Sequence, residues 1–120
     1  MPPKLGNGKI CYIEIPSKDI AASAAFYESV FGWTVRTRDD HSVAFDDGVG
    51  QVSGTWVLNR EPATSGLVVH IMVDDASAVV EKMVSHGGQI VQELGKQHPE
   101  ITALFSDPSG NVLGIFQEPV

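Results

Sequence analysis

Phe45-Asp46-Asp47-Gly48-Val49-Gly50-Gln51-Val52-Ser53-Gly54 is the first copy of a pattern that returns 60 residues later, and this repetition indicates the fold. The second copy is Phe105-Ser106-Asp107-Pro108-Ser109-Gly110-Asn111-Val112-Leu113-Gly114, and both read Phe-x-Asp-x-x-Gly-x-Val-x-Gly. An apolar run, a turn built on Asp and Gly, and a second apolar run are typical of two antiparallel strands. The repetition predicts that the chain contains two copies of one unit.

A second match, at a spacing of 56 residues, extends the repeat toward the N-terminus. It aligns Tyr12 with Val68, Glu14 with His70, and Asp19 with Asp75. Each Asp precedes a run with apolar residues at helical spacing, so each unit is expected to begin strand–helix. The remaining apolar runs are short, alternate in polarity and are separated by turn residues, which predicts three further strands per unit.

The predicted architecture is therefore α+β, with two tandem βαβββ modules whose curved mixed sheets face a cleft and whose helices lie outside. The expected helices are 18–30 and 75–86, and the expected strands are 10–15, 33–38, 42–45, 51–58, 66–73, 89–92, 102–105 and 111–117. One domain, 1–120, contains a first module at about 9–58 and a second at about 66–117. The polar stretch 59–65 is the expected linker, and 94–101 is an expected loop.

Composition excludes several classes of partner. The chain has 8 Lys and Arg against 15 Asp and Glu, so its net charge is −7 and it would repel nucleic acid and anionic membranes. The sequence shows no apolar run of membrane-spanning length and no signal-peptide pattern. Its single cysteine, Cys11, cannot form an intrachain disulfide and is expected to be a buried, inert thiol, which suits the cytoplasm.

Strand alternation predicts which side chains would line the cleft. Cys11, Ile13 and Ile15 share one face of the first strand, which should pack under the helix. The opposite, mixed face carries a set of side chains that we expect to bind a ligand. That set is Tyr12, Glu14, Gly54 and Trp56 in the first module, and Val68, His70, Met72, Gly114 and Phe116 in the second.

Several segments resemble the vicinal oxygen chelate superfamily, which includes glyoxalase I, bleomycin-resistance proteins, fosfomycin-resistance enzymes and extradiol dioxygenases. The resembling segments are Ile10–Asp19, Ala25–Trp33, Val73–Ala78 and Asp107–Gly114. The resemblance covers nearly the whole chain and implies the scaffold described above, without implying one reaction.

The resemblance also implies where a metal would bind. Metal enzymes of this superfamily use a His or Gln on the first strand and a Glu on the last strand of each module. Counting from the motifs places these positions at Tyr12, Gly54, Val68 and Gly114, which offer at most one phenol oxygen. We therefore expect no metal and no other cofactor.

Other residues allow competing interpretations. Glu14 and His70 are candidate catalytic residues, as an acid/base pair or as a displaced metal site, although a hydrogen-bonded pair without chemistry is the simpler interpretation. Trp56 and Phe116, with Tyr12 and Met72, would stack on a flat ligand or fill a core. Arg36 and Arg38 alternate outward and would meet an anionic group or remain solvated.

These observations favour a protein that binds or sequesters a small organic molecule in a metal-free cleft, as bleomycin-resistance members do. The alternative is a metal-dependent lyase, isomerase or dioxygenase that uses Glu14 and His70. A third hypothesis is a protein that only dimerises or docks a partner through the same face. A homodimer is expected in any case, because a single module leaves a sheet edge and one side of the cleft uncovered.

Overall fold

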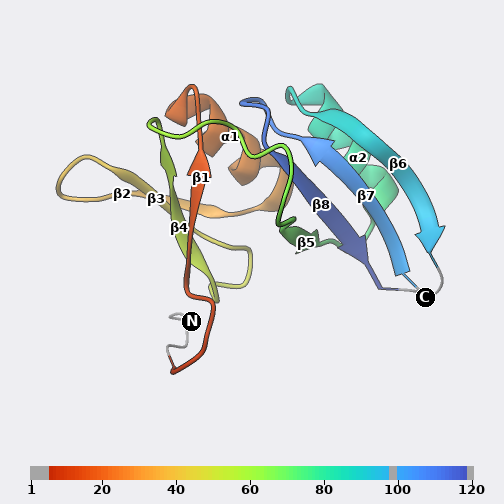
Figure 1. The fold of residues 1–120 in the computed structure, drawn as a ribbon, viewed down its shortest axis with the longest axis horizontal. Helices are drawn as coiled ribbons and strands as arrows, with labels where there is room; N and C mark the ends of the chain where they lie inside the picture. Colours follow the sequence, from red (N-terminus) through yellow and green to blue (C-terminus); the bar gives the residue numbers. More distant parts are fainter. Residues whose placement is uncertain (1–5, 98–99, 119–120) are drawn as a thin grey trace. The chain divides into compact units, whose positions relative to one another are not determined.

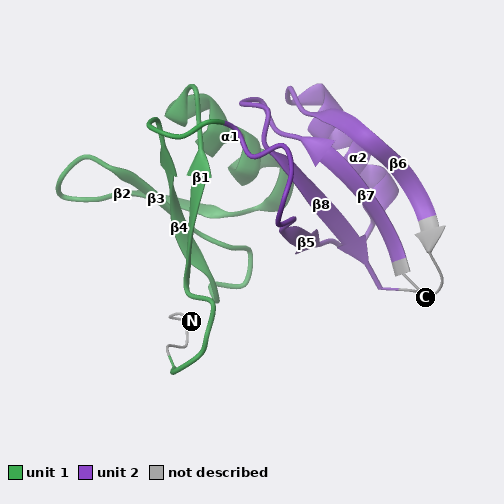
Figure 2. Ribbon diagram, in the orientation of Figure 1, with its two compact units in different colours: residues 1–61 green, residues 62–120 purple. Residues whose placement is uncertain are grey.

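The computed structural model describes residues 6–97 and 100–118. The chain forms two compact units, Met1–Glu61 and Pro62–Val120, shown in Figure 2. The division falls inside the stretch 59–65 that the sequence marks as a linker. Each unit contains one α-helix and one four-stranded mixed sheet, so the predicted α+β fold of two βαβββ modules is confirmed. That the two sheets enclose a cleft stays a prediction.

The first unit has the strand order β1-β4-β3-β2, with β1 parallel to β4 and the other pairs antiparallel (Figure 1). Its helix packs against β2, β3 and β4. The elements of this unit are β1 (Tyr12–Pro16), α1 (Ile20–Phe31), β2 (Thr34–Thr37), β3 (Val43–Asp46) and β4 (Ser53–Val57).

The second unit repeats this topology, with the order β5-β8-β7-β6 and with β5 parallel to β8. Its elements are β5 (His70–Met72), α2 (Ala76–Ser85), β6 (Gln89–Gln97), β7 (Glu100–Ser106) and β8 (Val112–Gln117). The strands β6 and β7 extend into residues 94–101, so the prediction of a loop over this whole range is wrong. The pair His98-Pro99 lies outside the described residues.

Both helices begin at the equivalent aspartates of the repeat. The side chain of Asp19 accepts a hydrogen bond from the backbone N–H of Ala22, and Asp75 accepts one from Ala78, each at 3.1 Å. A carboxylate at this position satisfies an N–H group that has no partner within the helix. The first helix therefore starts at Ile20, directly after Asp19, and not at residue 18 as the sequence predicted. It ends at Gly32, whose φ of 71° places it in the left-handed region that favours glycine.

An aromatic stack forms the core of the first unit. The ring of Trp33 lies 4.6 Å from that of Tyr27 on α1 and 4.5 Å from that of Phe45 on β3, measured between centroids. Phe45 in turn lies 4.8 Å from Trp56 on β4. All four side chains are buried. The stack joins the helix to the centre of the sheet and so fixes which face of β4 is internal.

The second unit has a smaller core, built from Met83, Phe105, Ile115 and their neighbours. Its first strand, β5, lies at the edge of the sheet and is only three residues long. Leu67 and Val69, which precede it, are 97% and 40% exposed. Neither described helix has the length or the run of apolar residues that a bilayer crossing requires.

Candidate functional site

The loops between the last two strands differ in length by one residue. In the first unit the Asp47 N–H donates to the carbonyl of Val52, whereas in the second the Asp107 N–H donates to the carbonyl of Asn111. The first loop therefore contains one more residue before the pairing resumes. Side chains alternate along a strand, so one added residue reverses the face of every residue that follows.

This difference changes the counterpart of Gly114. In the parallel ladders Glu14 pairs with Thr55, while its repeat mate His70 pairs with Gly114. The position in the first unit that corresponds to Gly114 is thus Thr55, not Gly54. Matching the two Phe-x-Asp-x-x-Gly-x-Val-x-Gly patterns residue by residue misses the extra loop residue.

Gly54 and Trp56 consequently face the helix, whereas the sequence predicted both on the opposite face with the other ligand-binding candidates. Trp56 is 3% exposed, and its ring centroid lies 6.0 Å from that of Tyr27 on α1. A Cβ atom at Gly54 would overlap the Phe45 ring and the Ile13 carbonyl. The glycine permits close packing of the core and leaves no space for a ligand.

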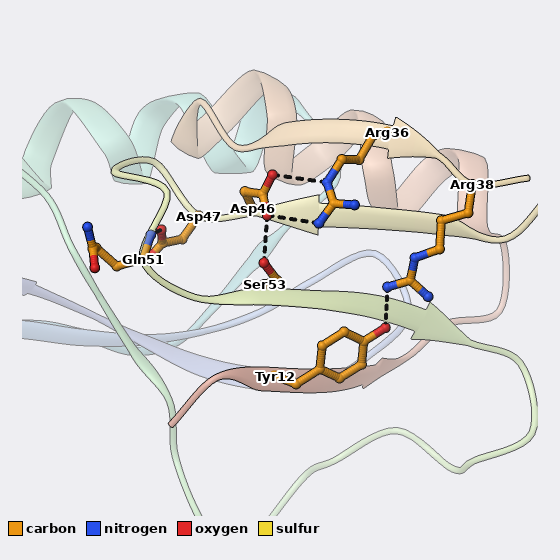
Figure 3. Close-up of polar contacts among 7 residues, drawn as sticks. All are labelled: Tyr12, Arg36, Arg38, Asp46, Asp47, Gln51 and Ser53. Carbon is orange, nitrogen blue, oxygen red and sulfur yellow. Dashed lines mark hydrogen bonds and ion pairs between the residues drawn. The ribbon is translucent and has the colours of Figure 1, made fainter. Parts of the chain in front are cut away.

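The sheet face away from α1, called here the open face of the first unit, is polar. Arg36 on β2 donates two hydrogen bonds of 3.0 Å to the carboxylate of Asp46 on β3 (Figure 3). Ser53 on β4 donates a third, of 2.6 Å, to the same carboxylate. These hydrogen bonds hold the pKa of Asp46 below its ordinary value, chiefly through Arg36, and the carboxylate raises the pKa of Arg36.

Tyr12 and Arg38 meet on this open face. A guanidinium nitrogen of Arg38, which follows β2, donates a hydrogen bond to the Tyr12 hydroxyl oxygen. The central carbon of the guanidinium lies 5.5 Å from the centroid of the Tyr12 ring, in cation–π range. Figure 3 shows both side chains extended toward one another. Tyr12 thus occupies the face predicted for it, and Arg38 faces the same way.

Glu14 also lies on the open face and forms an ion pair with Arg60, at 2.8 Å. Both side chains are partly exposed, at 41% and 59%. Its predicted mate His70 belongs to the second unit. Their pairing as an acid and a base stays a prediction.

The second unit places its predicted ligand-binding residues on the face away from α2. His70 pairs with Gly114, and Met72 pairs with Phe116, so the four residues share one face. A Cβ atom at Gly114 would overlap the imidazole of His70, which therefore covers the glycine. Met72 is 62% exposed, and Val68, just before β5, is 40% exposed. Along β8 the alternation of faces is as predicted, because the loop before this strand has the shorter length.

The family follows from a comparison of the sequence with models of known families. The model of the Glyoxalase/Bleomycin resistance protein/Dioxygenase superfamily matches residues 9–115. The chain belongs to this superfamily. A Mycobacterium tuberculosis protein named "Putative glyoxylase CFP32" is 28% identical over 123 residues, which cover 88% of this chain and 44% of that protein.

A second relative of this chain is the anthracycline biosynthesis protein DnrV of Streptomyces peucetius. It is 25% identical over 141 residues, covering 98% of this chain and 50% of that protein. The chain thus spans about half the length of these two relatives. A superfamily structure from Burkholderia phytofirmans has the same fold, with a TM-score of 0.77, 20% identity, and coverage of 92% of this chain and 99% of that one.

The residues at the metal positions of the superfamily do not fit a divalent ion. The Tyr12 hydroxyl accepts a hydrogen bond from Arg38. Thr55 takes the place of Gly54 as the counterpart of Gly114, and its hydroxyl donates a hydrogen bond of 2.6 Å to the Val43 carbonyl. Val68 and Gly114 have no donor atom in their side chains. Within residues 6–97 and 100–118, no group of three or more His, Cys, Asp and Glu side chains could hold a metal ion. The donor set thus lacks the carboxylates and imidazoles that such ions require.

Two further side chains differ from the sequence interpretation. Cys11 is exposed rather than buried, because β1 begins only at Tyr12. Arg38 was interpretable as a solvated strand residue, yet it reaches Tyr12. The only sequence signal for Arg38 was its outward alternation with Arg36, which does not predict contact with a strand that lies at the other edge of the sheet.

Proposed function

We propose that this protein binds a small, largely aromatic organic molecule without a resident metal, and thereby sequesters or carries it. The binding surfaces would be the open faces, meaning the sheet faces away from α1 and from α2. The observation that carries this proposal is the chemistry of the metal positions. The superfamily's metal enzymes place their ligands at four positions. In this chain those positions hold a threonine, a valine, a glycine, and a tyrosine whose hydroxyl accepts a hydrogen bond from a guanidinium. The scaffold keeps a binding surface whose side chains suit an organic molecule.

The side chains of the open faces support an aromatic ligand. Tyr12, 43% exposed, offers an aromatic ring in the first unit, and Phe116, half-buried, offers one in the second. Met72 adds an exposed, flexible thioether beside Phe116. Aromatic and thioether groups contact flat apolar surfaces favourably, while polar neighbours orient the ligand.

The name of one relative suits an aromatic ligand. The Streptomyces peucetius relative is an anthracycline biosynthesis protein, and anthracyclines are flat, fused-ring aromatic molecules. A planar polycyclic ligand would suit the ring of Phe116 and the thioether of Met72.

We also propose that the protein is cytoplasmic, because the exposed thiol of Cys11 would stay reduced there. Cell fractionation tests this location.

The test of this proposal is a titration of a fluorescent anthracycline with metal-free protein, followed by fluorescence anisotropy. We expect saturable binding in the micromolar range, and about tenfold weaker binding for Phe116→Ala and Met72→Ala. Val84→Ala is the control, because Val84 is an apolar residue of α2 that is 53% exposed. An anisotropy that does not change as protein is added contradicts the proposal. Equal affinities of all three variants for the anthracycline also contradict it.

A further inference from the structure

The contact between Tyr12 and Arg38 crosses the whole open face of the first unit. β1 and β2 are the two edge strands of the order β1-β4-β3-β2, and Arg38 directly follows β2. Neighbouring strands lie about 4.8 Å apart, so the two edges are separated by about 14 Å. The two long side chains must therefore lie over β3 and β4 to meet, as Figure 3 shows.

Arg38 differs in its partners from the two other guanidiniums of this unit. Arg36 is held by both oxygens of Asp46, and Arg60 is paired with Glu14. Among the described residues, Arg38 has no carboxylate within ion-pair distance; its side chain contacts the neutral hydroxyl and the ring of Tyr12. Its positive charge is therefore not neutralised by a direct ion pair.

Two acidic residues, Asp39 and Asp40, directly follow Arg38, and the carboxylate of Asp40 is already engaged. One of its oxygens accepts from both the backbone N–H and the hydroxyl of Ser42, at 3.0 and 2.7 Å. Arg38 acts on Asp40 only through a longer-range electrostatic attraction. The backbone of Arg38 is in turn fixed by a 2.8 Å hydrogen bond from its N–H to the Ser42 carbonyl.

The remaining donors of Arg38 suit an incoming anion. A guanidinium has five N–H donors arranged as a planar fork, and the Tyr12 hydroxyl accepts from one nitrogen. A carboxylate prefers two parallel hydrogen bonds from such a fork. Tyr12 restricts the guanidinium to one place on the open face, which lowers the entropy lost when a ligand binds.

We infer that Arg38, positioned by Tyr12, is the anchor for a carboxylate group of the organic ligand. This inference rests on the proposed function and adds that an aromatic ligand carrying a carboxylate is bound more tightly than a comparable one without it. The carboxylate binds the fork of Arg38, and the ring of Tyr12 lies beside it as an aromatic surface. Arg38 sets the specificity of the site, and Tyr12 is its positioning residue.

The experiment is a titration of the ¹⁵N-labelled full chain with benzoate, observed at the Nε–Hε resonances of its arginines at constant ionic strength. Benzamide, which has nearly the same shape and no charge, is the matched probe. We expect benzoate to shift the Arg38 resonance saturably, with a Kd of about 1–10 mM, and benzamide to leave it unmoved. Benzoate should also shift the backbone amide resonances around Arg38 and Tyr12. By that readout its affinity should fall at least about tenfold in Arg38→Gln, which lacks the Nε–Hε resonance, and a few-fold in Tyr12→Phe.

Arg60→Gln is the control, because it removes a guanidinium of the same unit that already has a carboxylate partner. Its benzoate affinity should equal that of the unmodified protein. An Arg38 resonance unmoved by benzoate up to about 50 mM, or an Arg38→Gln variant that keeps the response, overturns the anchor. If the anthracycline still binds in that case, the proposed function stands and only the anchor fails.

Discussion

Gly54 and Gly114 are matched in the repeat but face opposite environments. Gly54 lies against the Phe45 ring and the backbone of Ile13, whereas Gly114 lies under the exposed imidazole of His70. The same added methyl group therefore meets a rigid core at one position and a side chain with free space beyond it at the other. Gly54 thus serves the packing of the core, whereas Gly114 belongs to the surface that we propose binds the ligand.

We predict that Gly54→Ala lowers the free energy of unfolding by about 1–3 kcal/mol, because neither the carbonyl nor the stacked ring can move without disturbing the core. Gly114→Ala should change it by less than about 0.5 kcal/mol, because the His70 ring can turn toward solvent. Chemical denaturation measures both. Equal costs for the two variants would show that the assignment of faces is incorrect.

The strands β2, β3 and β4 are tied together on the open face by one carboxylate. Asp46 on β3 accepts from Arg36 on β2 and from Ser53 on β4. The pKa of Asp46 is lowered in the folded chain, mainly by Arg36, so its ionised form stabilises the fold. That stabilisation is complete above the ordinary carboxyl pKa and is lost as the pH falls through the lowered value.

We predict that Asp46→Asn lowers the free energy of unfolding at neutral pH by roughly 1 kcal/mol, and that this difference shrinks in acid as Asp46 is protonated in the unmodified protein. Denaturation curves between pH 7 and about pH 2 measure the trend. Asp39→Asn, at an exposed position, changes the net charge equally and should show a smaller effect. A destabilisation by Asp46→Asn that persists unchanged in acid contradicts the role of the carboxylate.

Sequence patterns predicted the elements because their signals are local. The aspartates that cap the helices and the glycine that ends α1 act within a few residues of themselves. The face of β4 was not predictable in this way, because it depends on whether a loop closes at Val52 or one residue earlier. The reach of Arg38 to Tyr12 was also inaccessible, because it depends on the order of strands across the sheet.

At the scale of the whole molecule, the exposed apolar residues beside the sheet edges predict self-association. β1 and β5 each form the end of a sheet. Ile10, 75% exposed, precedes β1, and Leu67, 97% exposed, precedes β5. Edge strands with apolar neighbours tend to pair with another chain, and a second copy is the partner we propose.

We predict a homodimer of twice the 12.9 kDa chain mass in sedimentation at micromolar concentration. Leu67→Asp should shift the equilibrium toward the monomer, because a charge at the interface loses its hydration. Val84→Asp is the matched control, since Val84 is exposed on α2. A monomer mass for the unmodified protein at that concentration contradicts the dimer.

The proposed function requires that the protein binds an organic molecule without a metal. Native mass spectrometry of the full chain, stripped with chelator and then mixed with an anthracycline, tests this requirement. We predict an adduct of one ligand per chain that is equally abundant with and without added zinc, nickel, manganese or iron. A ligand adduct that forms only with metal, or stoichiometric metal retained in protein purified without added metal, would contradict the proposed function and favour a metal-dependent enzyme.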